Sequence, residues 1–272
     1  MSGSAGPILI VGAGAMGGAL IAGWLESGAF PASDLMIRDP APGARALASQ
    51  AAGARLNPPD AMLSMARTLL LAVKPARWRE VAVAVAPHLA PDAVVVSIVA
   101  GVPADPISKA FGGRRVARAM PTTAAAIGKG TASLYASDAE ALRRAHCLFE
   151  PLGDIVELAA EDQLHAATAA SGSAPAYFYA FAEALADAGV AAGLGRPLAE
   201  QLARSTLTGA AALMGRSDES PAKLRAAVTS PGGTTQAALE VLNGERGLGP
   251  LLARAVAAAV ARSRELGAQA TQ

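Results

Sequence analysis

The chain has 272 residues, of which 23 are Lys or Arg and 22 are Asp or Glu, and its formal net charge is +1. This balance, without a basic block, argues against nucleic-acid or membrane-surface binding and leaves a small molecule as the expected partner. The single cysteine, Cys147, excludes an intramolecular disulfide and a cysteine-based metal cluster, and it favours a reducing, cytoplasmic location.

The first expected element is an apolar strand at residues 7–11, which ends in GAGAMG and leads into a helical pattern with a glycine stop. Residues 7–25 are apolar enough to imitate a signal peptide, but no basic residue precedes Arg38, so we expect the segment to fold. Charges or turn residues interrupt every later apolar stretch, and no membrane-spanning segment is predicted.

Strands and helices continue to alternate after this first pair. A helical pattern, ARALASQAAG, follows the second apolar run, and others cover 77–86 and 138–150. The further expected strands cover residues 34–39, 68–73, 94–99, 115–120 and 131–135. Such alternation predicts an α/β fold with a Rossmann-type, doubly wound and mostly parallel sheet.

The pattern changes near Glu161, after which only helices are expected. We therefore place a dinucleotide-binding domain at residues 1–160 and a helical domain at residues 161–272. The helical segments cover 161–192 with an interruption at SGSAP, 197–215, 220–228, and 234–266 with an interruption at NGERGLG. Their abundant alanines give small side chains for a core, so we expect close helix packing or burial against a second copy.

The glycine-rich turn GAGAMG has the G-x-G-x-x-G spacing of dinucleotide-binding folds, and it lies between a strand and a helix as that motif requires. Such glycines allow a tight turn, close approach of a pyrophosphate to the backbone at the helix N-terminus, and close helix packing. A purely structural glycine turn is the alternative. The expected cofactor contacts are Gly12, Ala13, Gly14, Ala15, Met16 and Gly17.

Arg38 and Asp39 lie at the end of the second expected strand and give opposite indications about the cofactor. The Asp39 carboxylate would bind the ribose hydroxyls and repel a 2′-phosphate, which favours NAD(H). Arg38 could instead hold the 2′-phosphate of NADP(H). A solvated pair of charges at the strand end is the third interpretation.

The strand expected at 68–73 runs into AVKP, at the carboxyl edge of the sheet, where open α/β folds bind ligands. Lys74 is either a cofactor ligand or a solvated loop lysine. The expected cofactor contacts of this segment are Ala72, Val73, Lys74 and Pro75.

A second turn rich in glycine, VTSPGGTTQAA at 228–238, precedes another helical run. Proline fixes one backbone angle, the glycines free the next, and the threonines offer a helix cap beside exposed backbone N–H groups. The segment is either an ordinary turn before a capped helix or a cradle for an anion.

No pattern indicates a metal site or a nucleophilic triad. His88, His146 and His165 are scattered without metal-ligand spacing, and no G-x-S-x-G elbow is present. The chemistry is therefore expected from the bound cofactor.

Taken in order, GAGAMG, AVKP, VVSIVAG, SGSAPAY and SPGGTT resemble pyrroline-5-carboxylate reductase over essentially the whole chain. The resemblance implies hydride transfer from NADP(H), or from NAD(H) given Asp39, to a cyclic imine carboxylate, which yields proline. It also implies a homodimer that forms through interlocking C-terminal helices and often assembles into a decamer, with each site completed by the second subunit.

The resemblance further assigns roles to residues of the two later motifs. It implies that Thr235, near the ring nitrogen, and Ser173 are catalytic. The substrate carboxylate is then expected at Ser171, Gly172, Ser230, Gly232, Gly233 and Thr234.

Two positions depart from the family pattern. MPTTA has Thr122, an expected cofactor contact, in place of the usual Asn, and Ala124 in place of Pro, so cofactor geometry or substrate choice is open to change. His165 replaces the usual Asp and is either a pH-sensitive residue or, as we favour, a tolerated surface change. The alternatives are a reductase of another cyclic imine and a catalytically weak dinucleotide-binding paralogue. Retention of SGSAPAY and SPGGTT argues against the paralogue.

Overall fold

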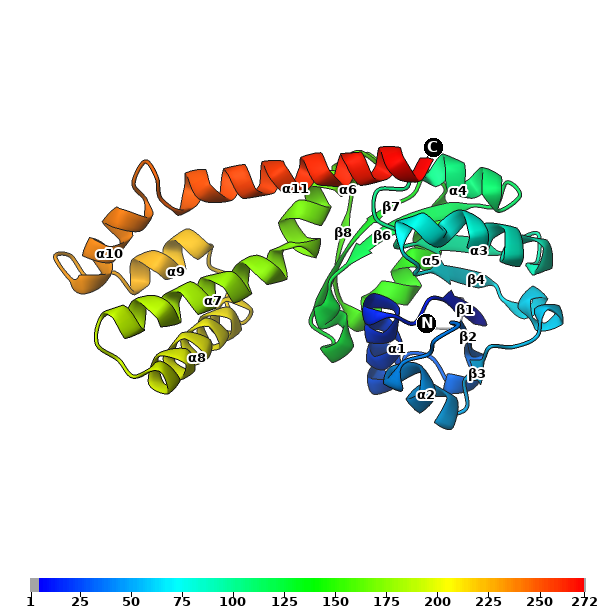
Figure 1. Cartoon of the computed structure of the whole chain (residues 1–272), viewed down its shortest axis with the longest axis horizontal. Helices are drawn as coiled ribbons and strands as arrows, with labels where there is room; N and C mark the ends of the chain where they lie inside the picture. The colour runs from blue at the N-terminus through cyan, green and yellow to red at the C-terminus, as the bar shows by residue number, and fades with distance from the viewer. Residues whose placement is uncertain (1–4, 272) are drawn as a thin grey trace. The chain divides into compact units, whose positions relative to one another are not determined.

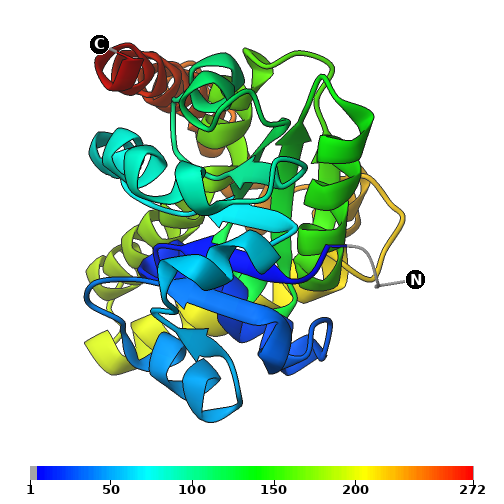
Figure 2. The ribbon, with the colours of Figure 1, turned by 90° about the vertical axis from the view of Figure 1, so that its right-hand side faces the viewer.

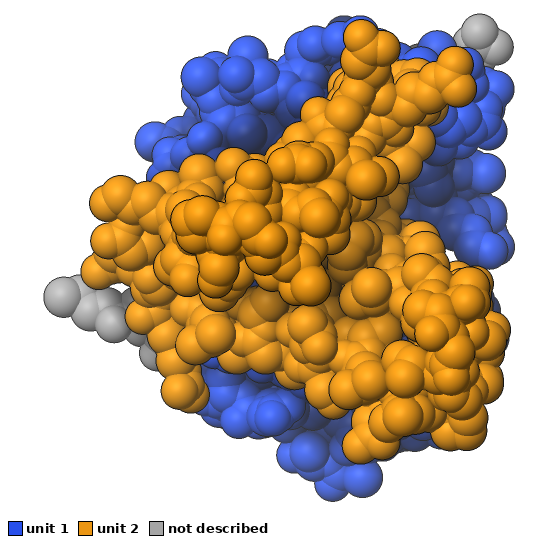
Figure 3. All heavy atoms as spheres, turned by 90° about the vertical axis from the view of Figure 1, so that its left-hand side faces the viewer, with its two compact units in different colours: residues 1–172, 259–272 blue, residues 173–258 orange. Residues whose placement is uncertain are grey.

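The computed structural model describes residues 5–271 of the chain (Figure 1). The chain forms two compact units, one of residues 1–172 with 259–272 and the other of residues 173–258 (Figure 3). The first unit holds the sheet and the end of the last helix, and the second unit is helical. Each unit is described by itself below.

One sheet of eight strands organises the described part of the first unit, in the order β3-β2-β1-β4-β5-β6-β7-β8. Every neighbouring pair is parallel except β6 and β7, which are antiparallel. From β1 the chain first adds β2 and β3 on one side and then β4 to β8 on the other, as in a doubly wound sheet. This confirms the predicted fold class. The strands are β1 (Ile8–Val11), β2 (Leu35–Arg38), β3 (Arg55–Leu56), β4 (Thr68–Leu71), β5 (Val94–Ser97), β6 (Val116–Pro121), β7 (Gly130–Tyr135) and β8 (Gly153–Glu157).

Helices cover both faces of this sheet because its strands are apolar on both sides (Figure 2). In β1, Ile8 and Ile10 join one buried cluster, and Leu9 and Val11 join the other, as the two-residue period of a strand requires. Helices α1 and α5 contribute to the first cluster, and α3 and α4 to the second. Their bounds are α1 (Ala15–Ser27), α2 (Ala44–Ala51), α3 (Trp78–Val85), α4 (Ala104–Ala110) and α5 (Ala139–Phe149).

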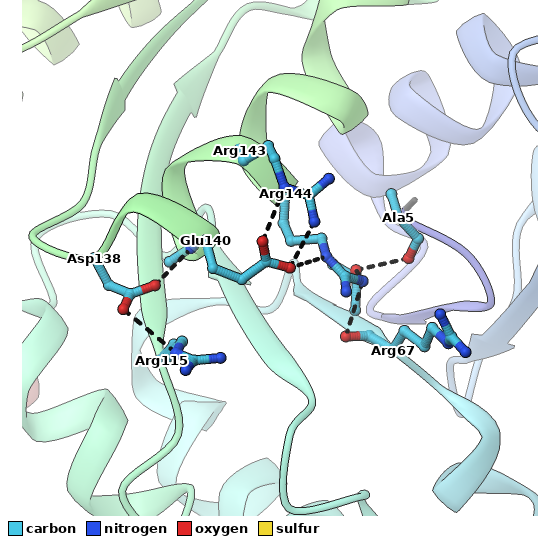
Figure 4. A network of polar contacts seen from close by, with 9 residues as sticks. Ala5, Arg67, Arg115, Asp138, Glu140, Arg143 and Arg144 are labelled. Atoms are coloured by element: carbon cyan, nitrogen blue, oxygen red, sulfur yellow. Dashed lines mark hydrogen bonds and ion pairs between the residues drawn. The ribbon is translucent and has the colours of Figure 1, made fainter. Parts of the chain in front are cut away.

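A polar network fastens the edge of the sheet where its parallel strands begin (Figure 4). Thr68, fully buried at the start of β4, donates its hydroxyl to the carbonyl of Ala5 at 2.7 Å. Arg144 of α5 donates to the Thr68 hydroxyl at 3.2 Å and to Glu140 at 2.7 Å. The network joins α5, β4 and the segment before β1, and it lies at the edge opposite to the usual ligand edge.

Three elements lack a sequence prediction. Strand β3 has two residues, and β8 carries exposed Asp154, Val156 and Glu157, so neither gives a clear apolar run. Helix α4 is short and contains Pro106. In each case pairing or packing within the unit stabilises a segment whose local pattern is weak.

From Gln163 to Thr271 the regular elements are all helices, as predicted. The interruption expected at SGSAP starts earlier, as a π-helical turn over Thr168–Gly172, and α7 begins at Ala174 after Ser173. The buried apolar cluster of the second unit consists of Ala186, Ala199 and Ala203, with Val190 beside it, which confirms the prediction of small core side chains. The helices are α6 (Gln163–Ala167), α7 (Ala174–Ala191), α8 (Arg196–Met214), α9 (Pro221–Ala227), α10 (Thr234–Leu242) and α11 (Leu248–Thr271).

Candidate functional site

The three glycines of GAGAMG differ in what their missing side chains permit. A Cβ on Gly12, which has φ +98°, would lie 2.5 Å from the Ala72 carbonyl oxygen, and one on Gly17 would lie 2.0 Å from that of Gly12. These two glycines are required by the turn and by the packing of α1. A Cβ on Gly14 would meet no protein atom within 4 Å. The space beside Gly14 is therefore open for a ligand.

The N-terminus of α1 at Gly14 provides donors for that ligand. Gly14 is the N-cap and makes no side-chain cap hydrogen bond, and no acidic residue lies in the first turn. The Gly18 N–H makes the first helical bond, to the Gly14 carbonyl at 2.8 Å, so the preceding N–H groups have no partner within the helix. Such an end attracts a pyrophosphate, and these residues fit the dinucleotide expected from the sequence.

One cavity of about 310 Å³ brings the three predicted cofactor segments together at the carboxyl ends of β1, β2 and β4. Ala15 and Met16 form the first turn of α1, with Met16 packed against the core, and Pro75 starts a 3₁₀ turn after Lys74. The cavity is lined by Val11, Gly12, Gly14, Arg38, Asp39, Pro40, Ala72, Val73, Lys74, Arg77 and Val81.

Hydrogen bonds hold both the carboxylate and the backbone of Asp39. Its Oδ2 accepts from the Ala13 N–H at 2.6 Å, and its Oδ1 accepts from the Ala41 N–H at 2.8 Å. The Asn57 side chain accepts from the Asp39 N–H and donates to the Asp39 carbonyl, both at 3.0 Å. Each carboxylate oxygen keeps a second lone pair, which can accept a ribose hydroxyl.

Arg38 is paired with Asp60. Because Asp39 also has protein partners, the two residues are not a pair of charges left to solvent at the strand end. The Arg38 guanidinium also donates to the Pro58 carbonyl at 3.4 Å. The second oxygen of Asp60 lies 3.5 Å from His88 Nε2. Residues 57–60, NPPD, therefore contact both members of the Arg38–Asp39 pair.

Arg77 and Lys74 are the two other cations that line the cavity. Arg77 makes two hydrogen bonds to Glu80, at 2.6 and 2.9 Å, which raise the pKa of Arg77 and lower that of Glu80. Lys74 is exposed at the end of AVKP. The sequence prediction missed Asn57 and Asp60, although the two prolines between them mark a turn after a strand of the same sheet.

Thr122 is buried and lies outside this cavity. Its N–H donates to the Thr131 carbonyl and its hydroxyl accepts from the Thr131 N–H, both at 3.0 Å, so its oxygen extends the pairing of β6 with β7. Its role as a cofactor contact stays a prediction. Ala124 lies in a 3₁₀ segment, Thr123–Ile127, that packs closely on α1.

The π-helical turn positions Ser171 and Gly172 in the first unit. The Ser171 hydroxyl donates to the Ala167 carbonyl at 2.8 Å, and Ser171 lines a second cavity, of about 390 Å³, beside β7 and β8. A Cβ on Gly172 would lie 3.1 Å from the sulfur of Met120, so the turn lies against the MPTTA segment. π-turns of this kind are frequent at functional sites.

His165 is partly buried rather than freely exposed, and whether it is a tolerated change stays a prediction. Its side chain is 15% exposed, and its Nδ1 lies 2.8 Å from the hydroxyl of Ser263 in α11. Burial lowers the pKa of His165, and the charges of Arg118 and Arg264 lower this pKa further, against opposite contributions from Asp162 and Glu161.

The SPGGTT segment lies in the second unit and joins α9 to α10. Gly232 has φ +69°, the Gly233 N–H donates to the Ser230 carbonyl at 3.0 Å, and Gly233 is the N-cap. The predicted threonine cap is wrong, because Thr234 and Thr235 already form the first turn of α10 and no side chain caps it.

The first backbone bond of α10 runs from Ala237 to the Gly233 carbonyl at 3.2 Å, so the N–H groups of residues 234–236 have no backbone partner within the helix. This leaves exposed donors beside two threonine hydroxyls, which fits an anion cradle. The Gly232 N–H, by contrast, donates to the Gln236 side chain at 2.8 Å. Ser173, also in the second unit, is the N-cap of α7 and makes no side-chain cap bond.

Within residues 5–271, no three His, Cys, Asp or Glu side chains gather as potential metal ligands. No helix in that range combines the length and the apolarity needed to cross a membrane.

Comparisons with known proteins cover both units. Residues 161–266 match the family model for pyrroline-5-carboxylate reductase dimerisation, and residues 7–101 match that for coenzyme F420-dependent NADP oxidoreductases. Pyrroline-5-carboxylate reductase of Synechocystis sp. is 36% identical, covering 95% of this chain and 97% of the relative.

Solved structures agree with this comparison. A pyrroline-5-carboxylate reductase from Coxiella burnetii has a TM-score of 0.87 at 30% identity, covering 97% of this chain and 99% of its own. The pyrroline carboxylate reductase of Plasmodium falciparum, with NADP bound, has a TM-score of 0.81 at 26% identity, covering 96% of this chain and 97% of its own. By sequence over nearly its full length and by fold, this chain belongs to the pyrroline-5-carboxylate reductase family.

Proposed function

We propose that this protein reduces L-1-pyrroline-5-carboxylate to L-proline with a reduced nicotinamide dinucleotide, the last step of proline biosynthesis. The observation that carries the proposal is the cavity at the carboxyl edge of the sheet, where the open position beside Gly14 meets the N-terminus of α1 and the fixed Asp39 carboxylate. The cofactor, when bound there, supplies hydride to the imine carbon.

The residues of SPGGTT orient the substrate. The exposed N–H groups at the start of α10 hold the substrate carboxylate, with help from Ser230, and the carboxylate fixes the ring face that accepts hydride. The Thr235 hydroxyl donates to the ring nitrogen, because an imine accepts hydride more readily when its nitrogen is protonated or hydrogen-bonded. Ser173, the N-cap of α7 in the same unit, adds to the carboxylate site in this proposal. The roles of Ser171 and Gly172 toward the substrate stay predictions.

The preferred cofactor in this proposal is NAD(H), and NADP(H) is the weaker one. A 2′-phosphate on the adenosine ribose would meet the Asp39 carboxylate, which two backbone N–H groups hold in place. Arg38, the cation best placed to offset that repulsion, is paired with Asp60.

The protein acts as a homodimer in this proposal, with the helices of the second unit covered by a second copy. The second unit has a buried cluster of three alanines and one valine beside it, while Phe178 and Tyr179 are 57% and 69% exposed. Apolar exposure on this scale is typical of an interface. We propose further assembly into a decamer, and a cytoplasmic location where reduced cofactor is regenerated.

The test is oxidation of NADH and of NADPH by the purified protein, followed at the nicotinamide absorbance, with and without pyrroline-5-carboxylate. We expect rapid imine-dependent oxidation, with a higher kcat/KM for NADH. Absence of imine-dependent oxidation with both cofactors would overturn the proposed activity.

A further inference from the structure

We propose that Asp60 is a specificity-determining residue that suppresses NADP(H) binding by neutralising Arg38. Asp60 acts here as a positioning residue, because it is not among the residues that line the cavity at the carboxyl ends of β1, β2 and β4. The inference rests on the proposed function only in that a nicotinamide dinucleotide occupies this cavity.

Arg38 stands at the place where a 2′-phosphate would need a cation. It is the last residue of β2, its side chain is 25% exposed, and it lines the cavity beside Asp39. A guanidinium binds phosphate strongly when its N–H groups are free to form two parallel hydrogen bonds. Left unpaired, Arg38 would make this cavity competent for NADP(H) in spite of Asp39.

The contacts of Arg38 prevent this. One guanidinium nitrogen, Nη2, donates both to the Asp60 carboxylate and to the Pro58 carbonyl, the latter at 3.4 Å. Both acceptors belong to the turn after β3, and the carboxylate cancels the positive charge that would attract a phosphate. An incoming 2′-phosphate must therefore compete with Asp60 as well as face Asp39.

Asp60 is itself held in place. Its second oxygen lies 3.5 Å from His88 Nε2, and Pro59 before it fixes an extended backbone with φ −63° and ψ 154°. The Asn57 amide binds the backbone of Asp39 from the same turn. One short segment thus keeps the carboxylate of Asp39 at the cavity and holds the cation of Arg38 in an ion pair.

The test compares Asp60→Asn with the parent enzyme by fluorescence titration of NADH and NADPH and by imine-dependent kinetics with both. We expect the ratio of NADPH to NADH affinity to rise by roughly five- to fiftyfold, the range of one partly exposed charge-assisted hydrogen bond. The NADH constants should change little. Asp105→Asn, which removes an exposed carboxylate paired with Lys109 on α4, is the matched control.

A second background shows whether the effect passes through Arg38. Arg38→Ala should bind NADPH no better than the parent, and adding Asp60→Asn to it should leave the ratio unchanged. An unaltered ratio in Asp60→Asn, or an equal rise in the Arg38→Ala background, would overturn the inference. Loss of imine-dependent turnover in the parent enzyme instead overturns the proposed activity, while the binding titrations still decide the role of Asp60.

Discussion

Alanine substitutions at Gly17 and Gly14 should distinguish a glycine needed for packing from one needed for ligand binding. In Gly17→Ala the new Cβ would lie 2.0 Å from the Gly12 carbonyl oxygen, so α1 must shift from β1. Overpacking of this kind costs about 1–3 kcal/mol. In Gly14→Ala the methyl meets no protein atom within 4 Å, and Gly14 has an ordinary negative φ of −66°. The free energy of unfolding should therefore stay within about 1 kcal/mol of the parent value.

For cofactor affinity we expect the opposite: Gly14→Ala should have the larger effect. The methyl of Gly14→Ala occupies the space through which a pyrophosphate reaches the backbone, and we expect NADH affinity to fall by roughly tenfold or more. Thermal unfolding measures the first effect, at about 2–4 °C per kcal/mol for a domain of this size. Nicotinamide fluorescence titration measures the second. Equal melting temperatures for Gly17→Ala and parent, or undiminished NADH binding by Gly14→Ala, would refute the assignment of the two glycines.

Three further predictions concern other parts of the chain. Thr235→Ala should lower kcat by about ten- to a thousandfold while NADH affinity stays unchanged, and Thr235→Ser should restore most of the rate; unchanged kinetics would remove Thr235 from the mechanism. Phe178→Ser should shift the protein from dimer to monomer in light scattering, whereas Val83→Ser, at an even more exposed position of α3 (79%), should not. A monomeric parent would contradict this. The pKa of His165 is lowered from 6.5 in the folded chain, mainly by burial, so protonation favours the unfolded state as the pH falls below about 6.5. The parent should lose more free energy of unfolding between pH 7 and pH 5 than His165→Asn, and parallel profiles would show that His165 is not the source.

Local sequence patterns were sufficient to predict the motifs and strands whose signal is contiguous in the chain. The Gly12–Gly17 spacing between strand and helix located the cofactor turn, because that motif is contiguous and its glycines are needed for close backbone contacts. Strands with continuous apolar runs, such as β4 and β5, were recognised for the same reason. The short β3 and the exposed β8 were not, since their pairing partners, and not their own residues, make them strands.

Contacts between distant residues could not be predicted in this way. The partner of Arg38 is Asp60 and that of His165 is Ser263, far along the chain. Neither pair follows from a helical or strand period, and both become visible only when the fold places the elements together. The threonines of SPGGTT were misplaced for a different, local reason: α10 begins one residue earlier than a threonine cap would require, so both threonines lie inside the helix.

The alanine-lined interior of the second unit has a consequence for how the protein is made. Burial of apolar surface is what offsets the entropy of ordering a chain, and three small methyl side chains supply little of it. In the proposed dimer the missing burial comes from another polypeptide, so maturation of these helices is a second-order process whose rate depends on the encounter of two chains. The rate at which newly synthesised subunits complete folding would then depend on their concentration. At low concentration, a subunit would remain incompletely folded for longer than at high concentration.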